Sequence, residues 1–398
     1  MNVRKILFAA TTALLVVSTV SLSAQNAKQG DGVGTPKFGT DQSVTNFSAN
    51  ATTIPYYRSQ FTDPTNGVTY AYTMVGSNPS MNKSTTIKTV IIPMSFAFVA
   101  SSSANNVLDG STRVSQTIQS PVFQANNDIG LAASTTASAP PAGVAPSPRI
   151  VNEPSDVTQL GDAILRAQWG KTGSAYHVLL GQPTVLPTVS FTVPQNQGLL
   201  VVGSVSHARI GLMESSWFSN RLNETLRSYQ IPPDVLPIFL VYDTFLYSHS
   251  TANCCTLGYH GATASLNGNG KQSVNTYMFA SYSEPGIFGA NPGDAISYIQ
   301  DIHGLSHEVQ EWLDDPFVNN AVNPWLTPTA PQYGCTGALE TGDPVVGFGF
   351  IVAAQNGISY HPEDEVHYSW FARETPSRAE QGYFTYLNNF ASQAQGCN

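Results

Sequence analysis

The sequence predicts a mixed α/β or α+β fold, with a mixed sheet, packed helices and long loops, from three observations. Residues 88–99 bring together β-branched and aromatic side chains, which is typical of a strand. Residues 235–243 form a nearly continuous apolar run, as expected for a strand buried on both faces. Residues 294–314 repeat apolar side chains at helical spacing. We therefore expect a central sheet covered by helices.

Other segments of the chain predict further strands and helices. Pro93 within the first strand favours an edge position or a bulge, because proline cannot donate a ladder hydrogen bond. The expected helices are 111–119, 156–169 and 215–228, and the expected strands are 177–180, 185–193 and 199–205.

The predicted helix at about 294–314 has a start signal, a periodic face and a stop signal. Asp294 follows Pro292 and Gly293 and can cap the first turn, and the helix is expected to stop at Asp314-Asp315-Pro316. Its periodic apolar residues are Ile296, Ile299, Ile302, Leu305, Val309, Trp312 and Leu313.

The chain divides by composition into five parts. Arg4 and Lys5, an apolar run and small residues ending near Ala24 predict a signal peptide at 1–24, so we expect a secreted protein, extracellular or periplasmic. Residues 25–55 predict a flexible leader, and residues 56–133 a strand-rich N-terminal part. Residues 134–148 read as a Pro/Ala/Ser linker or inserted loop, and 149–398 as the main part with the metal site.

Charge and cysteine content narrow the partners and the compartment. The formal net charge is −9, so nucleic acid and anionic lipid are poor partners. Beyond the signal there is no second apolar run of about 18 residues, so we expect no membrane association after its removal. Four cysteines in an exported chain favour up to two disulfides. We expect Cys254 and Cys255 to reach separate partners, because a vicinal bridge needs a strained peptide.

The predicted helix carries imidazoles and carboxylates at metal-ligand spacing. His303, His307 and Glu311 are four residues apart and fall on one stripe of the helix. His307-Glu308-x-x-Glu311 is similar to the zincin pattern His-Glu-x-x-His, in which the Glu is the general base, but a carboxylate replaces the second imidazole. The alternative is a solvated face with i,i+4 pairing.

Two other segments offer candidates for the same site. His260 has glycines on both sides and could be a ligand or a transition-state donor; the alternative is a hydrogen-bonded loop histidine. Glu340 is the best third ligand, because catalytic zinc takes three protein ligands and leaves one position open. Asp343 could orient a ligand imidazole, or the two carboxylates could belong to an ordinary acidic turn before Pro344.

The remaining polar clusters carry less chemistry. Residues 361–367 hold three acidic and two histidine residues, and we interpret them as a structural loop, with the alternative that His361 or His367 lines the cleft. Isolated histidines at 177, 207 and 249 are expected to be structural. The chain has no Gly-x-Ser-x-Gly elbow, which argues against a serine hydrolase.

The order of these motifs resembles a known pattern. Gly-Tyr-His260-Gly, then Ser-His307-Glu-Val-Gln-Glu311 with Asp315-Pro316, then Glu340-Thr-Gly-Asp343 is similar to secreted microbial proteins and to the plant phosphate-induced, or EXORDIUM-like, proteins. The resemblance covers roughly residues 235–345. It departs after Asp343, where that group often has a nearby Cys and this chain has Pro-Val-Val. The resemblance implies a metallopeptidase-like site without an assigned substrate.

The sequence thus predicts a secreted metal-dependent hydrolase of the zinc metallopeptidase type, acting on peptide or protein. We expect His307, Glu311 and Glu340 to bind Zn²⁺, with His303 as an additional ligand or its neighbour; Ca²⁺ or Mn²⁺ are alternatives. Glu308 would be the base, and His260 would stabilise the oxyanion. The alternative is a non-catalytic extracellular or cell-surface binding protein with a structural metal or a hydrogen-bonded His/Glu cluster; carbohydrate binding is a weaker option.

Overall fold

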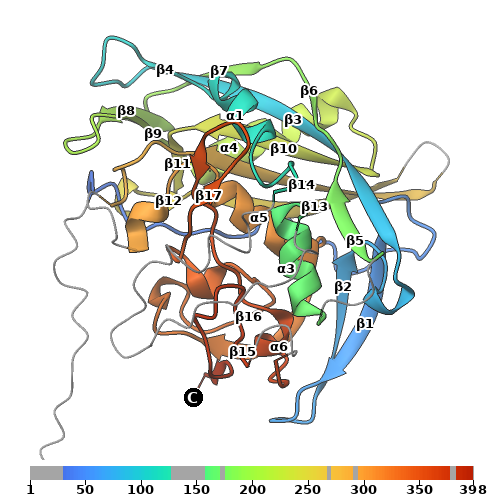
Figure 1. The fold of residues 1–398 in the computed structure, drawn as a ribbon. Coiled ribbons are helices and arrows are strands. Elements are labelled where there is room, and N and C mark those ends of the chain that lie inside the picture. The colour runs from blue at the N-terminus through green and yellow to red at the C-terminus, as the bar shows by residue number, and fades with distance from the viewer. Residues whose placement is uncertain are drawn as a thin grey trace, which may run out of the picture.

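The computed structural model describes residues 30–126, 157–170, 175–266, 270–289, 295–376 and 382–397. The fold is a mixed α+β architecture centred on one large sheet with strand order β13-β14-β10-β3-β4 (Figure 1). β3 (Ser84–Phe98), β10 (Val235–Tyr242) and β14 (Gln272–Tyr282) run parallel, and β13 (Gly258–Leu266) pairs antiparallel with β14. Three short strands, β5, β6 and β7, also pair with β3. The predicted fold class is therefore confirmed.

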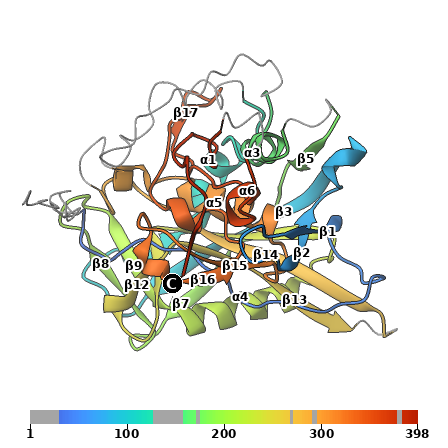
Figure 2. The ribbon, with the colours of Figure 1, turned by 90° about the horizontal axis from the view of Figure 1, so that it is seen from below.

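Both faces of the central sheet are buried, and β10 shows this directly. Its residues alternate between two apolar clusters, with Ile238 in one and Phe239 in the other. The first cluster contains Leu305 of α5 (His303–Asp314), and the second contains Phe218 of α4 (Ser215–Tyr229). The two helices thus cover opposite faces of the sheet (Figure 2). The continuous apolar run at 235–243 follows from this burial on both sides.

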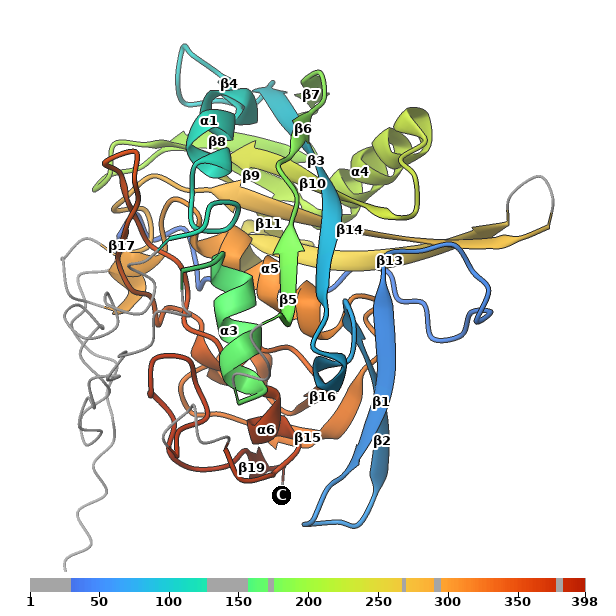
Figure 3. The ribbon, with the colours of Figure 1, turned by 45° about the vertical axis from the view of Figure 1, so that its right-hand side comes forward.

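Helix α5 lies between the central sheet and α3. It packs against β13 and β14 on one side and against α3 (Leu160–Gln168) on another, as Figure 3 shows. Gly161 of α3 permits this approach, because a Cβ there would lie 2.8 Å from the side chain of Leu313. The result is a helix with every side chain buried.

The remaining elements form smaller sheets and turns around this centre. A hairpin of β1 (Tyr56–Thr62) and β2 (Thr69–Val75) projects from the body (Figure 3). The other described strands and helices are β4 (Val107–Asp109), α1 (Val114–Ile118), β5 (His177–Leu180), β6 (Thr184–Val185), β7 (Val189–Val193), β8 (Gly198–Val202), β9 (Arg209–Glu214), β11 (Thr244–Tyr247), β12 (Cys254–Thr256), β15 (Ala321–Leu326), β16 (Thr336–Ala338), β17 (Val352–Ala353), β18 (Ser359–Tyr360), α6 (Tyr368–Phe371) and β19 (Gln395–Gly396).

Pro93 lies in an interior strand, and not at the sheet edge that was one of its two expected positions. β3 pairs with β10 on one side, and in its other pairings Ile91 faces Val185 of β6 and Met94 faces Val189 of β7. Pro93 therefore sits level with the break between β6 and β7. The missing ladder donor is tolerated where the neighbouring chain is not paired.

The helix expected at about 294–314 begins only at His303. A separate 3-10 turn occupies Ala295–Tyr298, and Asp301 breaks the path with a φ of 43°. The Asp301 side chain accepts hydrogen bonds from the backbone N–H groups of Ile302 and His361. Ile299 and Ile302 are nevertheless buried. The helical spacing of apolar residues therefore extends into a segment that is not α-helical. The expected cap at Asp294 lies outside the described residues.

Residues 30–55 are not the flexible leader that their composition predicts. Backbone N–H groups of Lys37, Asp41 and Val44 donate to Cys255, His260 and Phe317. Phe38, Val44 and Ile54 are at most 6% exposed. A few apolar side chains and regular backbone pairing fix this segment despite its polar composition.

The four cysteines form two disulfides, but not with the pairing expected for the adjacent pair. Cys254 bonds to Cys255 across a cis peptide, which brings their Cα atoms to 3.1 Å, and Cys335 bonds to Cys397. The expectation that Cys254 and Cys255 reach separate partners is therefore wrong.

The predicted signal at 1–24 and the predicted linker at 134–148 lie outside the described residues. Residues 56–126 are joined to the later part of the chain through the pairing of β3 with β10. No helix among the described residues has the length and apolar character needed to cross a membrane.

The packing of α5 predicts a large loss of stability when Leu313 is truncated. Leu313 is 2% exposed, so Leu313→Ala should lower the free energy of unfolding by about 2–5 kcal/mol. Leu266→Ala is the matched control, because Leu266 is 73% exposed, and it should change stability by about 0.5 kcal/mol or less. Chemical denaturation measures both. Equal effects of the two substitutions would contradict the packing described here.

Candidate metal centre

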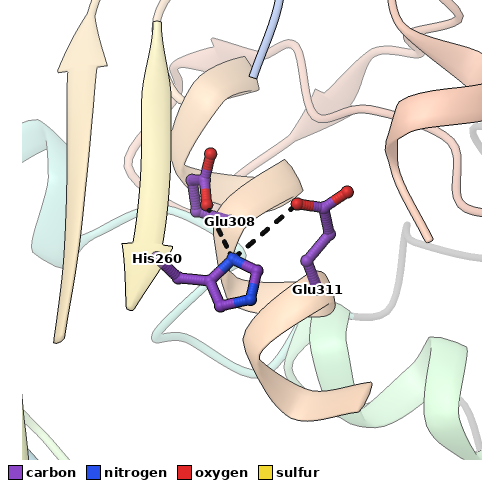
Figure 4. Close-up of side chains that lie close together, drawn as sticks. All are labelled: His260, Glu308 and Glu311. Atoms are coloured by element: carbon purple, nitrogen blue, oxygen red, sulfur yellow. Dashed lines mark hydrogen bonds and ion pairs between the residues drawn. The ribbon is translucent and has the colours of Figure 1, made fainter. Parts of the chain in front are cut away.

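Four segments bring histidines and carboxylates together along one side of α5. His303, His307, Glu308 and Glu311 come from α5, and His260 comes from β13, as Figure 4 shows for three of them. Glu340 and Asp343 follow β16, and the loop after β18 supplies Glu363 and Glu365. All of these side chains are buried, and none belongs to a residue more than 5% exposed. This helix face is therefore not solvated, although the i,i+4 pair expected by the alternative interpretation is present between His307 and Glu311.

His307, Glu311 and Asp343 present ligand atoms around a common point. The His307 Nε2 atom lies 3.1 Å from Glu311 Oε1 and 3.8 Å from Asp343 Oδ1, and it forms no hydrogen bond. Ligand atoms about 2.1 Å from a tetrahedral zinc ion are separated by about 3.4 Å. One imidazole and two carboxylates at these spacings fit a divalent ion.

Glu363 holds the opposite side of the His307 ring. The Nδ1 atom of His307 lies 3.0 Å from Glu363 Oε2 in a hydrogen bond. The position of Glu363 is fixed in turn, because its backbone N–H donates to Ser306 Oγ at 2.9 Å. A carboxylate that accepts from Nδ1–H sets the tautomer in which Nε2 is free to bind a metal. Sequence reasoning missed Glu363, although its segment concentrates three acidic and two histidine residues in a chain with 11% charged residues.

His303 lies on the far side of this arrangement. Its Nε2 atom is 2.9 Å from the same Glu363 Oε2 that contacts His307. Among the described residues, His303 joins neither group of three that could hold an ion. The structure therefore places it beside the carboxylate that orients His307.

His260 faces Glu308 and Glu311 from the sheet side (Figure 4). Its Nδ1 atom is hydrogen-bonded to Glu308 Oε2 at 3.2 Å and lies 3.8 Å from Glu311 Oε2. These three residues form a second group with metal-ligand spacing that shares Glu311 with the first. Here, however, the imidazole nitrogen is already hydrogen-bonded, whereas His307 Nε2 is not. His260 lies in β13 and not in a loop, but the hydrogen bond that the alternative interpretation expected is present.

The sequence assigned the third metal ligand to Glu340, but in the structure Asp343 also lies at the site. Asp343 belongs to the group around His307. Glu340 lies beside Glu311, and neither of its carboxyl oxygens has a hydrogen-bond donor in the described chain. The backbone N–H groups of Gly342 and Asp343 both donate to Glu311 Oε1 at 3.2 Å. This turn therefore positions Glu311 as well as supplying Asp343.

The buried acids near α5 fall into two classes. Asp314 accepts from Gln168 and Gln310, and Asp364 accepts from Asn389 and two backbone N–H groups, so their charge is supported by donors. The other class has carboxyl oxygens without any donor in the described chain, and comprises Glu308, Glu311, Glu340, Asp343, Glu363 and Glu365. Within the described residues, the ion pairs that these six carboxyl groups form are all with histidines.

Burial controls the protonation of the cluster when no cation is bound. Burial raises the pKa of Glu311 to about 8, and it raises the pKa of Glu308 well above its ordinary value, with repulsion from Glu311 adding to the effect. Burial lowers the pKa of His260 and of His303 to about 3, and lowers that of His307 well below its ordinary value. A buried carboxylate without a partner is costly, so the carboxyl groups of the cluster hold protons unless a cation replaces those protons.

No known protein family matches this chain, and no curated protein or solved structure is detectably similar to it. The case for the site therefore depends on its own geometry.

The close approach of Gly342 to His307 predicts sensitivity to one added methyl group. A Cβ at Gly342 would lie 2.3 Å from His307 Nδ1, so Gly342→Ala must displace the ring or the turn, at about 1–3 kcal/mol. Gly396→Ala is the matched control, because nothing lies within 4 Å of its added Cβ. Chemical denaturation should separate the two variants. Two equally stable variants would contradict the contact.

Proposed function

We propose that the chain is a metal-dependent hydrolase of the zinc peptidase type, secreted by means of the predicted signal at 1–24. One observation carries the proposal: His307 Nε2, buried and without a hydrogen bond, faces Glu311 and Asp343 amid carboxylates that no described Lys or Arg neutralises. A divalent cation supplies the missing charge. The imidazole favours Zn²⁺ or Mn²⁺ over Ca²⁺, which prefers oxygen ligands alone.

In this proposal His307, Glu311 and Asp343 hold the ion, and Glu340 is the neighbouring carboxylate that could join them. A bound zinc ion lowers the pKa of water and polarises a carbonyl group. Glu363 keeps the His307 ring in place through Nδ1. Glu311 is held by the two N–H groups of the Gly342 turn.

Glu308 is the proton acceptor in the proposal. Its Oε1 atom has no hydrogen-bond donor, while its Oε2 atom is hydrogen-bonded to His260 Nδ1. With Glu308 ionised, the single N–H of a neutral His260 is used on Glu308 and is not free for an oxyanion. This arrangement favours a positioning role for His260 over the oxyanion role that its sequence context suggested.

The second candidate function is a non-catalytic extracellular binding protein with a structural ion. The observation that favours it is the burial of every ligand, since structural zinc sites are closed and catalytic sites keep an open position. Catalytic turnover of peptides separates the two functions.

The base is tested by Glu308→Gln, which keeps the shape of the side chain. We expect zinc content to stay at the wild-type level and hydrolysis of a peptide mixture, followed by mass spectrometry, to fall about 10²- to 10⁴-fold. Glu224→Gln is the control, because Glu224 pairs with Arg221 on the exposed face of α4. Wild-type hydrolysis by Glu308→Gln would remove Glu308 from the mechanism. Absence of hydrolysis from every zinc-loaded form would favour the structural ion.

The ligand set is tested by comparing Asp343→Asn with Glu340→Gln. Because Asp343 Oδ1 faces His307 Nε2, Asp343→Asn should weaken zinc binding more than Glu340→Gln. Competition with a chelator of known affinity measures both. The reverse order would assign the third ligand to Glu340, as the sequence pattern predicted.

The role of Glu363 is tested by Glu363→Gln. Removing the carboxylate that orients His307 should weaken zinc binding about 10- to 100-fold, the usual effect of such a partner. The same chelator competition measures it. Unchanged affinity would show that His307 does not depend on Glu363.

A further inference from the structure

Residues 35–42, here called the cover segment, lie directly over the candidate metal centre. The ring of Phe38 stacks on the imidazole of His307, with centroids 3.7 Å apart and an interplanar angle of 20°. Phe38 is 4% exposed, and its backbone N–H donates to the hydroxyl of Tyr333 at 2.7 Å. The aromatic side chain of the cover segment therefore closes one approach to His307.

The cover segment is bound as an added parallel strand along β12 and β13. Its pairing includes the bridges of Lys37 to Thr256 and of Thr40 to His260. Five backbone hydrogen bonds of 2.7–3.0 Å connect it to the chain, namely Cys255 N–H to Thr35 O, Lys37 N–H to Cys255 O, Leu257 N–H to Lys37 O, Asp41 N–H to His260 O and Ala262 N–H to Gln42 O. One of the residues paired in this way, His260, also contacts Glu308.

The outer side of the cover segment is lightly packed. A cavity of about 500 Å³ is lined by residues 38–42 and by residues of α4, including Ser219 and Asn220. Thr40 and Gln42 are exposed, and nothing lies within 4 Å of a Cβ added at Gly39. The segment is thus held mainly by backbone hydrogen bonds, by Phe38 and by a hydrogen bond from Tyr277 to Asp41.

We propose that the cover segment occupies, within its own chain, the groove in which an extended peptide binds. Backbone pairing to β12 and β13 provides affinity for any extended peptide, and the space beside His307 selects a large aromatic side chain at the position of Phe38. The chain in this form blocks its own site, and displacement of the cover segment opens it. Only the statement that the bound peptide is cut depends on the proposed hydrolase function; the binding itself does not.

The test uses a chain whose cover segment is weakened. Lys37→Pro removes the N–H that pairs with Cys255, and Phe38→Ala removes the ring over His307. A fluorescent peptide with the sequence of residues 33–44 should bind this double variant saturably in an anisotropy titration. A peptide carrying Phe38→Ala should bind at least about tenfold more weakly, since a buried aromatic ring contributes more than 1.4 kcal/mol.

The wild-type chain and Phe47→Ala are the controls for peptide binding. Phe47 belongs to the same N-terminal stretch but packs on Phe317, so its removal should leave the groove filled and the peptide unbound. The proposal is overturned if a folded double variant, checked by circular dichroism, does not bind the peptide or binds both peptides equally. Binding without hydrolysis would support the groove and count against the hydrolase function.

A second measurement on the wild-type chain covers the case in which the double variant does not fold. The amides of Lys37 and Asp41 should exchange hydrogen at least about tenfold faster than those of β14, which is paired on both sides, because the segment opens locally. Equal protection of the two segments would show that the cover segment opens only with global unfolding and would overturn the proposal.

Discussion

The structure depends on how it compensates the negative charge buried around Glu311. Six carboxyl groups have oxygens without a hydrogen-bond donor, and they lie beside histidines that are also buried. Protons can neutralise such a cluster, and burial raises the pKa of Glu311 to about 8 accordingly. A divalent cation does the same while also using the free Nε2 atom of His307. Protonation leaves that nitrogen unused, which is why a cation is the neutralisation that we propose.

The fold provides the rigidity that such a cluster needs. Helix α5 is fixed by the sheet through Leu305 and by α3 through Leu313. Later loops then bring Asp343 and Glu363 to its polar side, where the backbone N–H of Asp343 donates to Glu311 and that of Glu363 donates to Ser306. These hydrogen bonds position both loops against α5.

The sequence predicts the parts of this arrangement that depend on local pattern. The strand at 235–243 follows from a continuous apolar run, and the line of His303, His307 and Glu311 follows from their four-residue spacing. Three features depend on contacts between distant residues and could not be predicted: the break at Asp301, the pairing of residues 35–42 with β13, and the placing of Glu363 against His307. Asp343 and Glu340 illustrate the limit, because spacing places both near the site without deciding which one faces His307.

The metal content of the purified chain tests the central claim most directly. Mass spectrometry of the wild-type protein, beside His307→Ala with its folding checked by circular dichroism, measures bound ions per chain. The account predicts about one divalent ion per wild-type chain, with zinc expected first, and loss of that ion in the variant. A folded wild-type chain that holds no ion, even after zinc and manganese are supplied, would contradict it and leave the carboxylates neutralised by protons.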